Sequence, residues 1–476
     1  MAYLYGDRRQ AMLFPSSIEE YVGADDPVRV YDAFVEQLDF AELGIDVDGD
    51  RVGAPEYHPQ AMLKLLVYGY AYGLRSSRKL ERATYHNLSF IWLLGGLKPD
   101  HKTIARFRRD HRRSLRRVLS QCAQMCLRLG LIDGNTLFVD GTKVAANASL
   151  AQSWTRARGE RELQKIEQRI AAILAECEAA DRREDAGEAA VRLPTALADA
   201  QALKARMEGV LEELGRGEQT AINTTDRDCR RMKGRHGVVA GYNVQAVVDD
   251  QQGLMVHADV VNDQNDAGQL AAQIESANAV VGGRCAVACG DAGYANTQVL
   301  KQLAAENITP IVPSQDQARR RPRGPFDKMR FIYDADLDQY RCPAGEILRY
   351  RKTDYGARQR TYLITHPSLC HRCASFGECT RAKQGRAIVR LMDEAAKQQF
   401  EAQFATPASQ AIYRRRKERV EHPFGHIKWN LGVRSFLLRG LSGVRAEASI
   451  LGTCFNLRRV ITLCGVSRLL QAWGTV

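Results

Sequence analysis

The chain has 476 residues, of which 45% are hydrophobic and 26% are charged. These proportions are typical of a folded globular protein and exclude an intrinsically disordered chain. Lys and Arg outnumber Asp and Glu by 68 to 56, and the resulting formal charge of +12 favours a polyanionic partner without identifying it. No apolar run approaches the roughly 18 residues that span a bilayer, and MAYLYGDRRQ lacks the apolar core of a signal peptide, so we expect neither membrane insertion nor secretion.

Residues 1–125 predict a basic helical domain. Apolar residues recur at helical spacing in HPQAMLKLLVYGYAYG, and a further helix is expected from Thr103 to Leu119. Between Lys98 and Arg117 there are nine Lys or Arg against two Asp. Short helices that end in an Arg-dense helix are typical of helix-turn-helix DNA-binding domains. A solvated basic helix face is the alternative.

Residues 151–218 predict a helical hairpin inserted into the domain around it. One apolar stripe at helical spacing runs from Leu163 through Leu174 to Cys177, and a second runs from Leu203 to Leu214, after a break at 185–194. Two antiparallel helices would pack along these stripes. A structural insertion is the favoured interpretation, and partner binding or dimerisation is the alternative.

The segments on either side of this hairpin predict a mixed α/β core over residues 130–312 and 390–465. The apolar run 137–139 leads into Asp140, residues 242–261 alternate as a β-hairpin, and a third apolar strand ends at Gly290 and Asp291. A helix is expected near 267–279. A basic, Pro- and Arg-rich linker and a cysteine-rich insertion occupy 313–389.

Asp140 and Asp291 each stand where an apolar run stops. A carboxylate there needs a partner, and divalent cations are partners that suit two carboxylates together. Two-metal phosphodiester cleavage uses such acids to hold two Mg²⁺ ions about 4 Å apart. The third acid would come from the late helix, where Glu421 and Glu418 compete. The alternative is that each aspartate only forms part of a turn. In that case neither Asp140, which precedes a glycine, nor Asp291 would bind metal.

Five blocks of the sequence resemble bacterial insertion-sequence transposases of the DDE class. In chain order they are HPQAMLKLLVYGYAYGLRSSRKLE, PDHKTIARFRRDH, FVDGTKVAANAS, CGDAGYAN and RRRKERVEHPFGHIKWNLGVRSFLLRGL, and together they cover nearly the whole chain. The resemblance implies an RNase H-like catalytic core, similar to that of retroviral integrases, behind an N-terminal helical DNA-binding domain. It also implies that Asp140, Asp291 and Glu421 are the catalytic acids and hold two Mg²⁺ or Mn²⁺ ions.

The family signature around the last acid has Tyr, Arg, Glu and Lys in fixed order. Here Tyr413, Arg416, Glu421 and Lys428 occupy those positions, although four residues rather than three separate Arg416 from Glu421. Lys417 fits the strict spacing instead. Glu421 and Lys428 lie about two helical turns apart and would share one helix face.

Three further residues of the same segment carry expectations. Pro423 should kink the helix or end it near Glu421, because proline disrupts a helix interior. Arg434 is expected to contact DNA phosphate together with the neighbouring basic residues. Trp429 is expected to pack in the core rather than to stack on a base.

The resemblance implies a reaction as well as a site. Water would hydrolyse one strand at each transposon end, and the released 3′-hydroxyl would attack target DNA. The partners would be double-stranded DNA at the terminal inverted repeats and at the target, bound by a homodimer in the bacterial cytoplasm at the nucleoid. No nucleotide cofactor is expected, since no GxxxxGK[ST] motif occurs. The alternatives are a transposase-derived DNA-binding protein without cleavage activity and a metal-dependent nuclease without strand transfer.

Four of the twelve cysteines cluster, and they predict a structural zinc site. The members of this cluster are Cys342, Cys370, Cys373 and Cys379. The Cys-x2-Cys spacing of 370 and 373 is that of a zinc knuckle, and residues 346–364 read as a β-hairpin that would bring Cys342 back to the others. His366 and His371 could replace one of the thiolates. Free thiols and a disulfide are the alternatives.

Overall fold

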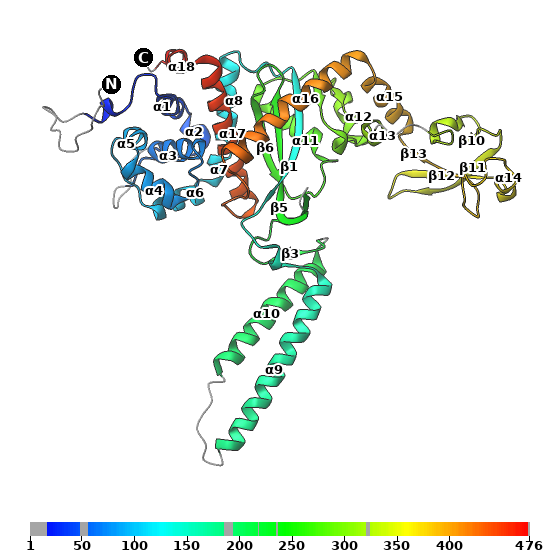
Figure 1. The fold of residues 1–476 in the computed structure, drawn as a ribbon, viewed down its shortest axis with the longest axis horizontal. Coiled ribbons are helices and arrows are strands. Elements are labelled where there is room, and N and C mark those ends of the chain that lie inside the picture. Colours follow the sequence, from blue (N-terminus) through cyan, green and yellow to red (C-terminus); the bar gives the residue numbers. More distant parts are fainter. Residues whose placement is uncertain are drawn as a thin grey trace, which may run out of the picture. The chain divides into compact units, whose positions relative to one another are not determined.

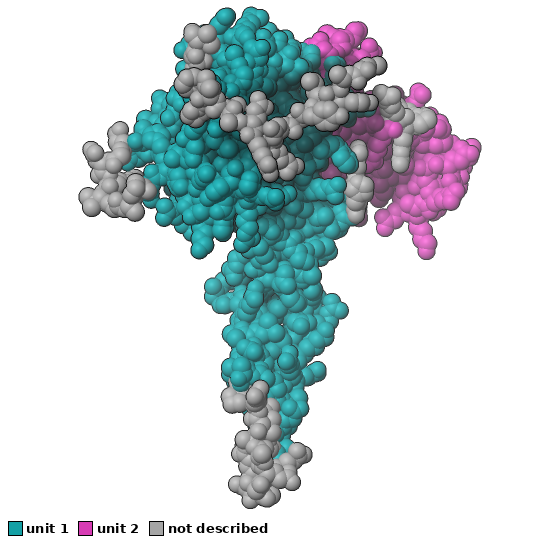
Figure 2. Space-filling view, turned by 60° about the vertical axis from the view of Figure 1, so that its left-hand side comes forward, with its two compact units in different colours: residues 1–266, 272–285, 417–476 teal, residues 267–271, 286–416 magenta. Residues whose placement is uncertain are grey.

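The computed structural model describes residues 17–47, 56–184, 194–217, 219–234, 237–319 and 324–474, without the side chains of 180–184 and 194. The chain divides into two compact units (Figure 2). Unit 1 comprises residues 1–266, 272–285 and 417–476, and unit 2 comprises 267–271 and 286–416. The chain passes between them inside α11 (Gln269–Val281) and inside α16 (Pro407–Gly425).

The N-terminal part of unit 1 is helical, as the sequence predicted (Figure 1). Its elements are the 3-10 helix η1 (Ile18–Tyr21) and the helices α1 (Val28–Glu36), α2 (Phe40–Leu43), α3 (Pro59–Ala71), α4 (Ser77–His86), α5 (Leu88–Leu93), α6 (His101–Asp110), α7 (Arg112–Leu115) and α8 (Val118–Arg128). Helix α3 starts with proline at its first turn, where the missing N–H costs nothing. A Cβ at Gly69 would lie 2.2 Å from the Leu80 side chain, so glycine allows α3 and α4 to pack closely.

A long C-terminal helix, α17 (Gly440–Cys464), forms the centre of unit 1. It packs against α3, α7 and α8 and against the strand β6 (Met255–Val261), and α18 (Val466–Ala472) follows it. Most of α17 is buried, including the polar residues Ser449, Thr453 and Asn456. The Asn456 side chain bonds both the N–H and the carbonyl of Met255, which fixes α17 to β6.

The strands of unit 1 pair in antiparallel fashion. The long strand β5 (Gly237–Asp249) pairs with β1 (Thr136–Ala145), with β4 (Arg230–Gly234) and with β6. Side chains alternate between the two faces of a strand, so Phe138, Asp140, Thr142 and Val144 of β1 share one face. That face carries the first acid predicted from the sequence.

Unit 2 contains a parallel strand pair and a separate antiparallel sheet. Strands β7 (Val287–Cys289) and β8 (Thr309–Ile311) are parallel and are joined through the 3-10 helix η3 (Ala292–Tyr294) and α12 (Thr297–Ala305). Antiparallel and parallel pairs therefore both occur, as expected for a mixed α/β fold. Helices α13 (Gln315–Arg319) and α15 (Glu394–Phe404) complete this part of the unit.

The cysteine-rich segment contains a five-stranded antiparallel sheet. Its strands are β9 (Ile332–Asp334), β10 (Gln339–Arg341), β11 (Ile347–Asp354), β12 (Gln359–Ile364) and β13 (Ala387–Leu391), in the order β13-β12-β11-β10-β9. The 3-10 helix η4 (Lys328–Arg330) precedes the sheet and α14 (Pro367–His371) lies between its last two strands. The expected hairpin over 346–364 is confirmed as β11–β12. Part of the predicted linker, 320–323, lies outside the described residues.

The predicted helical hairpin is present as α9 (Arg156–Glu184) and α10 (Pro194–Arg216), which run side by side (Figure 1). The short strands β2 (Ser153–Trp154) and β3 (Ile222–Asn223) pair at its base. The predicted stripes are only partly correct, because Leu174 and Leu203 are 45% and 42% exposed. The break at 185–193 lies outside the described residues.

No helix in the described part of the chain is both long enough and apolar enough to cross a membrane.

Candidate active site

Asp140 lies within a strand and not at its end. The first four residues of β1 are buried, Asp140 is partly buried, and the strand continues to Ala145. Asp140 is paired with Ala246 of β5, and Thr142 with Val244. The expectation that the strand stops at Asp140 is therefore wrong: the apolar run stops there, while the backbone pairing with β5 continues. The alternative reading of Asp140-Gly141 as a turn is also wrong.

Asp291 follows a strand, as the sequence predicted. It comes two residues after β7 and caps η3, where its Oδ1 accepts a 2.7 Å hydrogen bond from the Gly293 N–H. Its other carboxylate oxygen lies 3.7 Å from the guanidinium of Arg416, within unit 2. The side chain is 44% exposed, so its oxygens are accessible to a ligand.

Glu421 lies on the outer surface of α16. The helix runs through Pro423 to Gly425 and then changes to the π-helix η5 (His426–Asn430). The kink or helix end expected near Glu421 is thus found as the change to η5, which follows the end of α16 four residues after Glu421. Within the described part of the chain, no hydrogen bond or ion pair involves the carboxylate of Glu421, and the side chain is exposed.

Lys428 ties the segment after Glu421 to the strand of Asp140. Its ammonium group donates a hydrogen bond to the Thr142 hydroxyl. Thr142 is two residues after Asp140, and therefore on the same face of β1. Phe424 and Ile427 line a small cavity together with residues of β1 and β5 on that face. In unit 1, the segment that bears Glu421 therefore continues onto the face of the sheet that bears Asp140.

Thr142 was not singled out in the sequence, although the alternation of side chains along β1 places it beside Asp140. Nothing in the sequence distinguishes Thr142 from any other threonine in a strand. Its position two residues after the candidate acid Asp140 is the signal that could have identified it.

The structure distinguishes Arg416 from Lys417. Arg416 is 13% exposed and faces Asp291, whereas Lys417 is exposed. The ring of Tyr413, one turn earlier in the same helix, packs edge-on against Phe404 at 5.0 Å. Arg416 therefore contacts an acid, Asp291, whereas Lys417, which fits the strict spacing of the signature, is exposed.

Two histidines, His422 and His426, follow Glu421 in the sequence. Both His422 and His426 pack edge-on against Phe455. Burial lowers the pKa of each, and the nearby guanidinium groups of Arg459 and Arg458 lower it further. Their surroundings therefore favour the neutral form of both imidazoles.

Asp266 does not belong to this face. Helix α11 begins three residues after it, and the Asp266 carboxylate accepts hydrogen bonds from Asn243 and Gln245 at 2.6 and 2.8 Å. Lys143 lies 3.4 Å from the same oxygen. These partners alternate with the residues of the Asp140 face, so they lie on the opposite side of the sheet.

Trp429 was expected in the core, and this expectation is wrong. Its side chain is 81% exposed in the middle of η5. Arg434, which follows η5, is exposed as well. The reason is local: buried His426 and Leu431 take the inward positions of this segment.

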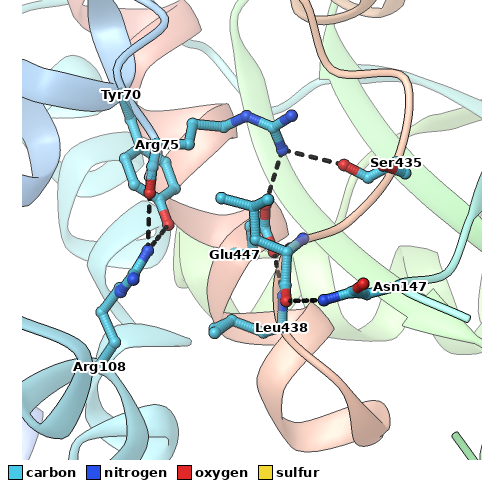
Figure 3. A network of polar contacts seen from close by, with 8 residues as sticks. Tyr70, Arg75, Arg108, Asn147, Ser435, Leu438 and Glu447 are labelled. Atoms are coloured by element: carbon cyan, nitrogen blue, oxygen red, sulfur yellow. Dashed lines mark hydrogen bonds and ion pairs between the residues drawn. The ribbon is translucent and has the colours of Figure 1, made fainter. Parts of the chain in front are cut away.

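Several residues in the basic run of the N-terminal helices have partners within the protein. Arg106 pairs with Glu56, Arg116 with Asp259, and Arg117 donates to the Glu42 carbonyl. Arg108 is 6% exposed, and its guanidinium donates to the Tyr70 hydroxyl and the Arg75 carbonyl (Figure 3). Arg108 thus contributes to the packing of unit 1, whereas most other basic residues between Lys98 and Arg117 are exposed.

A buried ion pair fixes the loop between η5 and α17. Glu447 of α17 is 0% exposed, and it accepts hydrogen bonds from the guanidinium of Arg75 at 2.8 Å and from the backbone N–H groups of Leu437 and Leu438 (Figure 3). Arg75 also donates to the Ser435 carbonyl. The N-terminal helices and the segment following Trp429 are therefore held to the same carboxylate.

The four clustered cysteines line one cavity of about 200 Å³ in unit 2. The Arg386 N–H lies 3.4 Å from the Cys370 sulfur. Burial raises the pKa of Cys379, the Arg386 guanidinium lowers it, and the three neighbouring thiols raise it. All twelve cysteines are free, which excludes the disulfide in this structure.

Across the described residues, no group of three or more His, Cys, Asp or Glu side chains is arranged to hold a metal ion. The donor types nevertheless suit the metals expected. Carboxylate oxygens are the ligands that Mg²⁺ prefers, and thiolates are those of structural Zn²⁺.

Comparison with known protein families identifies two matches. Residues 16–110 match a transposase domain (DUF772), and residues 341–461 match a transposase DDE domain. The second match contains Glu421, Lys428 and the four clustered cysteines, while Asp140 and Asp291 lie outside it. No curated protein and no solved structure matches the chain. The two matches, in this order along the chain, show that it is a catalytic transposase of the DDE class with an N-terminal transposase domain.

Proposed function

We propose that this transposase hydrolyses one strand at each end of its element and joins the released 3′-hydroxyl to target DNA. The observation that carries the proposal is the hydrogen bond from Lys428 to Thr142. It connects the segment of the DDE domain that bears Glu421, whose carboxylate is exposed and has no hydrogen-bond partner among the described residues, to the strand that bears Asp140.

Asp140, Asp291 and Glu421 are the proposed ligands of two Mg²⁺ or Mn²⁺ ions. Their chemistry fits these hard cations, and Asp291 and Glu421 offer exposed oxygens. When bound, such ions activate water and stabilise the leaving oxygen of an in-line displacement. The three acids come from β1, from the segment after β7 and from α16, which are far apart in the sequence.

The basic residues of the signature are proposed to hold DNA phosphates. Lys428 presents its ammonium group on the Asp140 face, and Arg434 is exposed after η5. Arg416, next to Asp291, would exchange its carboxylate partner for a phosphate once the carboxylate binds metal. Tyr413, one turn before Arg416, is proposed to position that turn of the helix against the DNA.

We also propose a division of the chain into domains and insertions. Residues 130–312 and 390–465 would form an RNase H-like core, which the DDE domain match supports. The hairpin 151–218 and the segment 313–389 would be insertions in it. Residues 1–125, which contain the DUF772 match, would form the helix-turn-helix-like DNA-binding domain. A homodimer on DNA is proposed because two element ends must be joined together.

The test uses purified full-length protein, Mg²⁺ and DNA that carries the terminal inverted repeats of its own element. The parent should nick each end and give joined products with target DNA. Asp140→Asn, Asp291→Asn and Glu421→Gln should each abolish both products, whereas Glu418→Gln, one turn before Glu421, should retain them.

The alternatives predict other results in the same assay. Binding without cleavage by the parent would favour a transposase-derived DNA-binding protein, and cleavage without joined products would favour a nuclease. Parent-like cleavage by all three acid variants would refute the proposed site.

We also propose that Cys342, Cys370, Cys373 and Cys379 bind a structural Zn²⁺ ion. The four thiols line one cavity, and a backbone N–H already points at one sulfur. Elemental analysis should find close to one zinc per chain, and less in Cys373→Ser than in the control Cys464→Ser, which lies outside the cluster. Less than half an equivalent in the parent would contradict this site.

A further inference from the structure

The segment 431–439 joins η5 to α17 and lies beside β1. The Phe436 N–H donates a 2.9 Å hydrogen bond to the Ala145 carbonyl, at the end of β1. The Asn147 side chain, just beyond the strand, donates to the Leu437 carbonyl at 2.8 Å. This connecting segment is therefore hydrogen-bonded to the strand that bears the first proposed acid, and its position follows that of the strand.

The turn between α3 and α4 contacts the same segment from the side of the N-terminal helices. The Arg75 guanidinium donates to the Ser435 carbonyl at 3.0 Å and to the buried Glu447 carboxylate at 2.8 Å (Figure 3). Gly73 lies close as well, since a Cβ there would be 3.7 Å from the Leu431 carbonyl oxygen. The Arg75 side chain is 11% exposed, so water competes little for these hydrogen bonds. The turn is therefore held against the connecting segment.

Arg108 fixes this turn from the Arg-dense helix α6. Its guanidinium donates to the Arg75 carbonyl at 2.8 Å and to the Tyr70 hydroxyl at 3.1 Å, and the residue is 6% exposed. A buried guanidinium stays turned toward its acceptors, because turning away would leave a buried charge without those hydrogen bonds. Helix α6 belongs to the matched transposase domain, residues 16–110. Polar contacts thus lead from that domain through Arg75 to the connecting segment and β1.

Apolar packing already attaches the N-terminal helices to the rest of unit 1, because α3 and α8 pack on α17. Hydrophobic contact is not directional, whereas a hydrogen bond between charged groups restricts both distance and angle. A buried ion pair often adds less stability than apolar side chains of similar size. The pair of Arg75 and Glu447 is therefore better explained by the position that it imposes on the connecting segment than by its stability.

We propose that Arg75 determines which phosphate of the DNA end is cut. This inference rests on the proposed function, because it requires the N-terminal domain to bind the terminal repeat while the acids cut it. Base pairs of duplex DNA follow one another about every 3.4 Å. A shift of that size between the N-terminal domain and β1 would therefore move the cut by one nucleotide. Arg75 is a positioning residue, since it acts through the connecting segment and not on the DNA.

The first experiment follows hydrogen exchange of the backbone amides of residues 436–438 in the full chain without DNA. Arg75→Met should speed this exchange about tenfold or more, because the segment loses the guanidinium that holds the Ser435 carbonyl and the Glu447 carboxylate. Exchange at the parental rate would show that Arg75 does not position the segment. That result would overturn the inference whether or not the protein cleaves DNA.

The second experiment maps, at nucleotide resolution, the 3′ ends that the full chain produces from a terminal-repeat end with Mg²⁺. The parent should cut mainly at one position. Arg75→Met should raise the fraction of cuts at neighbouring positions about tenfold, the factor that a hydrogen bond to a charged group contributes. Arg75→Lys keeps the charge but not the planar fork, so its fraction should be intermediate. Cuts by Arg75→Met at the parental position alone would overturn the inference, whereas a merely structural role would lower the rate without moving the cut.

Arg445→Met is the matched control. Arg445 of α17 is also paired with a carboxylate, that of Asp259 at 2.8 Å, and it donates to the Val260 carbonyl, so these contacts are with β6. This variant should keep the parental exchange at 436–438 and the parental cut position, although it loses a comparable ion pair. Equal effects in Arg445→Met and Arg75→Met would overturn the inference, because they would trace the change to lost stability.

A double variant keeps the test decisive if Arg75→Met does not fold. Arg75→Met combined with Glu447→Gln leaves no unpaired charge in the core, and the glutamine oxygen can still accept from Leu437 or Leu438. It should show the faster exchange and the displaced cuts. A parent that shows no cut ends, while the exchange result is as expected, would overturn the proposed function, and the role of Arg75 in cutting with it.

Discussion

Glu421 and Glu447 lie 26 residues apart in unit 1, and they have opposite environments. Glu447 is fully buried and accepts hydrogen bonds from one guanidinium and two backbone N–H groups. Glu421 is exposed and has no polar partner among the described residues. A carboxylate whose oxygens are occupied by the protein can only hold the fold together, whereas one whose oxygens are open can bind a ligand. The contrast indicates which acid is structural before any assay is done.

The largest effect is expected where the buried carboxylate is removed. Glu447→Ala leaves Arg75 buried without its partner and two N–H groups unsatisfied, so the free energy of unfolding should fall by about 4 kcal/mol. Denaturant unfolding measures this value. Glu421→Ala, measured in parallel, should unfold like the parent. Equal losses in the two variants would show that both glutamates are structural.

Glu421→Gln should reduce activity without reducing stability. Loss of one metal-binding carboxylate should slow cleavage of the terminal-repeat end by roughly 10³-fold, or about 4 kcal/mol of transition-state stabilisation. The melting temperature should stay within about 2 °C of the parent, since the side chain is exposed. Cleavage at a parent-like rate would remove Glu421 from the site.

A pH effect is expected at His257, on the side of the sheet opposite to Asp140. Burial lowers its pKa to about 4, which Asp259 opposes and Arg116 and Arg445 reinforce. The folded state therefore favours the neutral imidazole. The contribution of His257 to the free energy of unfolding is fully present above about pH 6.5, and it is lost as the pH falls toward 4.

The parent should thus lose up to about 3 kcal/mol of unfolding free energy between pH 7 and pH 4, relative to His257→Gln. Chemical denaturation of both proteins across this range provides the measurement. His86→Gln, at an exposed histidine on α4, should keep the pH dependence of the parent. Parallel curves for the parent and His257→Gln would show that this residue does not titrate with folding.

The smallest effect is expected at the link between η5 and β1. Thr142→Val keeps the shape of the side chain but removes the acceptor of the Lys428 hydrogen bond, so unfolding free energy should fall by about 1 kcal/mol. Cleavage should slow as well, because Lys428 loses its position on the Asp140 face. Thr353→Val, on the separate sheet of unit 2, is the control. An unchanged rate for Thr142→Val would mean that this contact does not position the site.

The sequence predicted the mixed α/β class and the N-terminal helical region correctly, because apolar periodicity and Gly- and Pro-containing turns are local signals. The β11–β12 hairpin was found in the same way. The sequence pattern did not reveal that β1 continues past Asp140, because the strand is extended there by pairing with residues 241–245 of β5, which are far away in the sequence.

Burial of polar and aromatic residues was harder to predict. Arg108 looks in the sequence like its basic neighbours, but the hydroxyl of Tyr70 and the carbonyl of Arg75 give it a buried site. Trp429 looks like a core residue, and only the packing of His426 and Leu431 leaves it outside. The assignments of Asp140, Asp291 and Glu421 as metal ligands stay predictions, since they depend on the site with metal and DNA bound.

The pairing of β2 with β3 has a consequence for how this chain can vary. Trp154 and Ile222 are neighbours across that pair, so the ends of the helical hairpin are already joined at its base. The entropy cost of closing such a loop rises only slowly with its length. Val210 and Leu214 of α10 pack against Ile222 and must be kept, but the helices farther from this base can be shortened or lengthened at little cost to the sheet, which makes that part a natural place to attach a label or a second binding module.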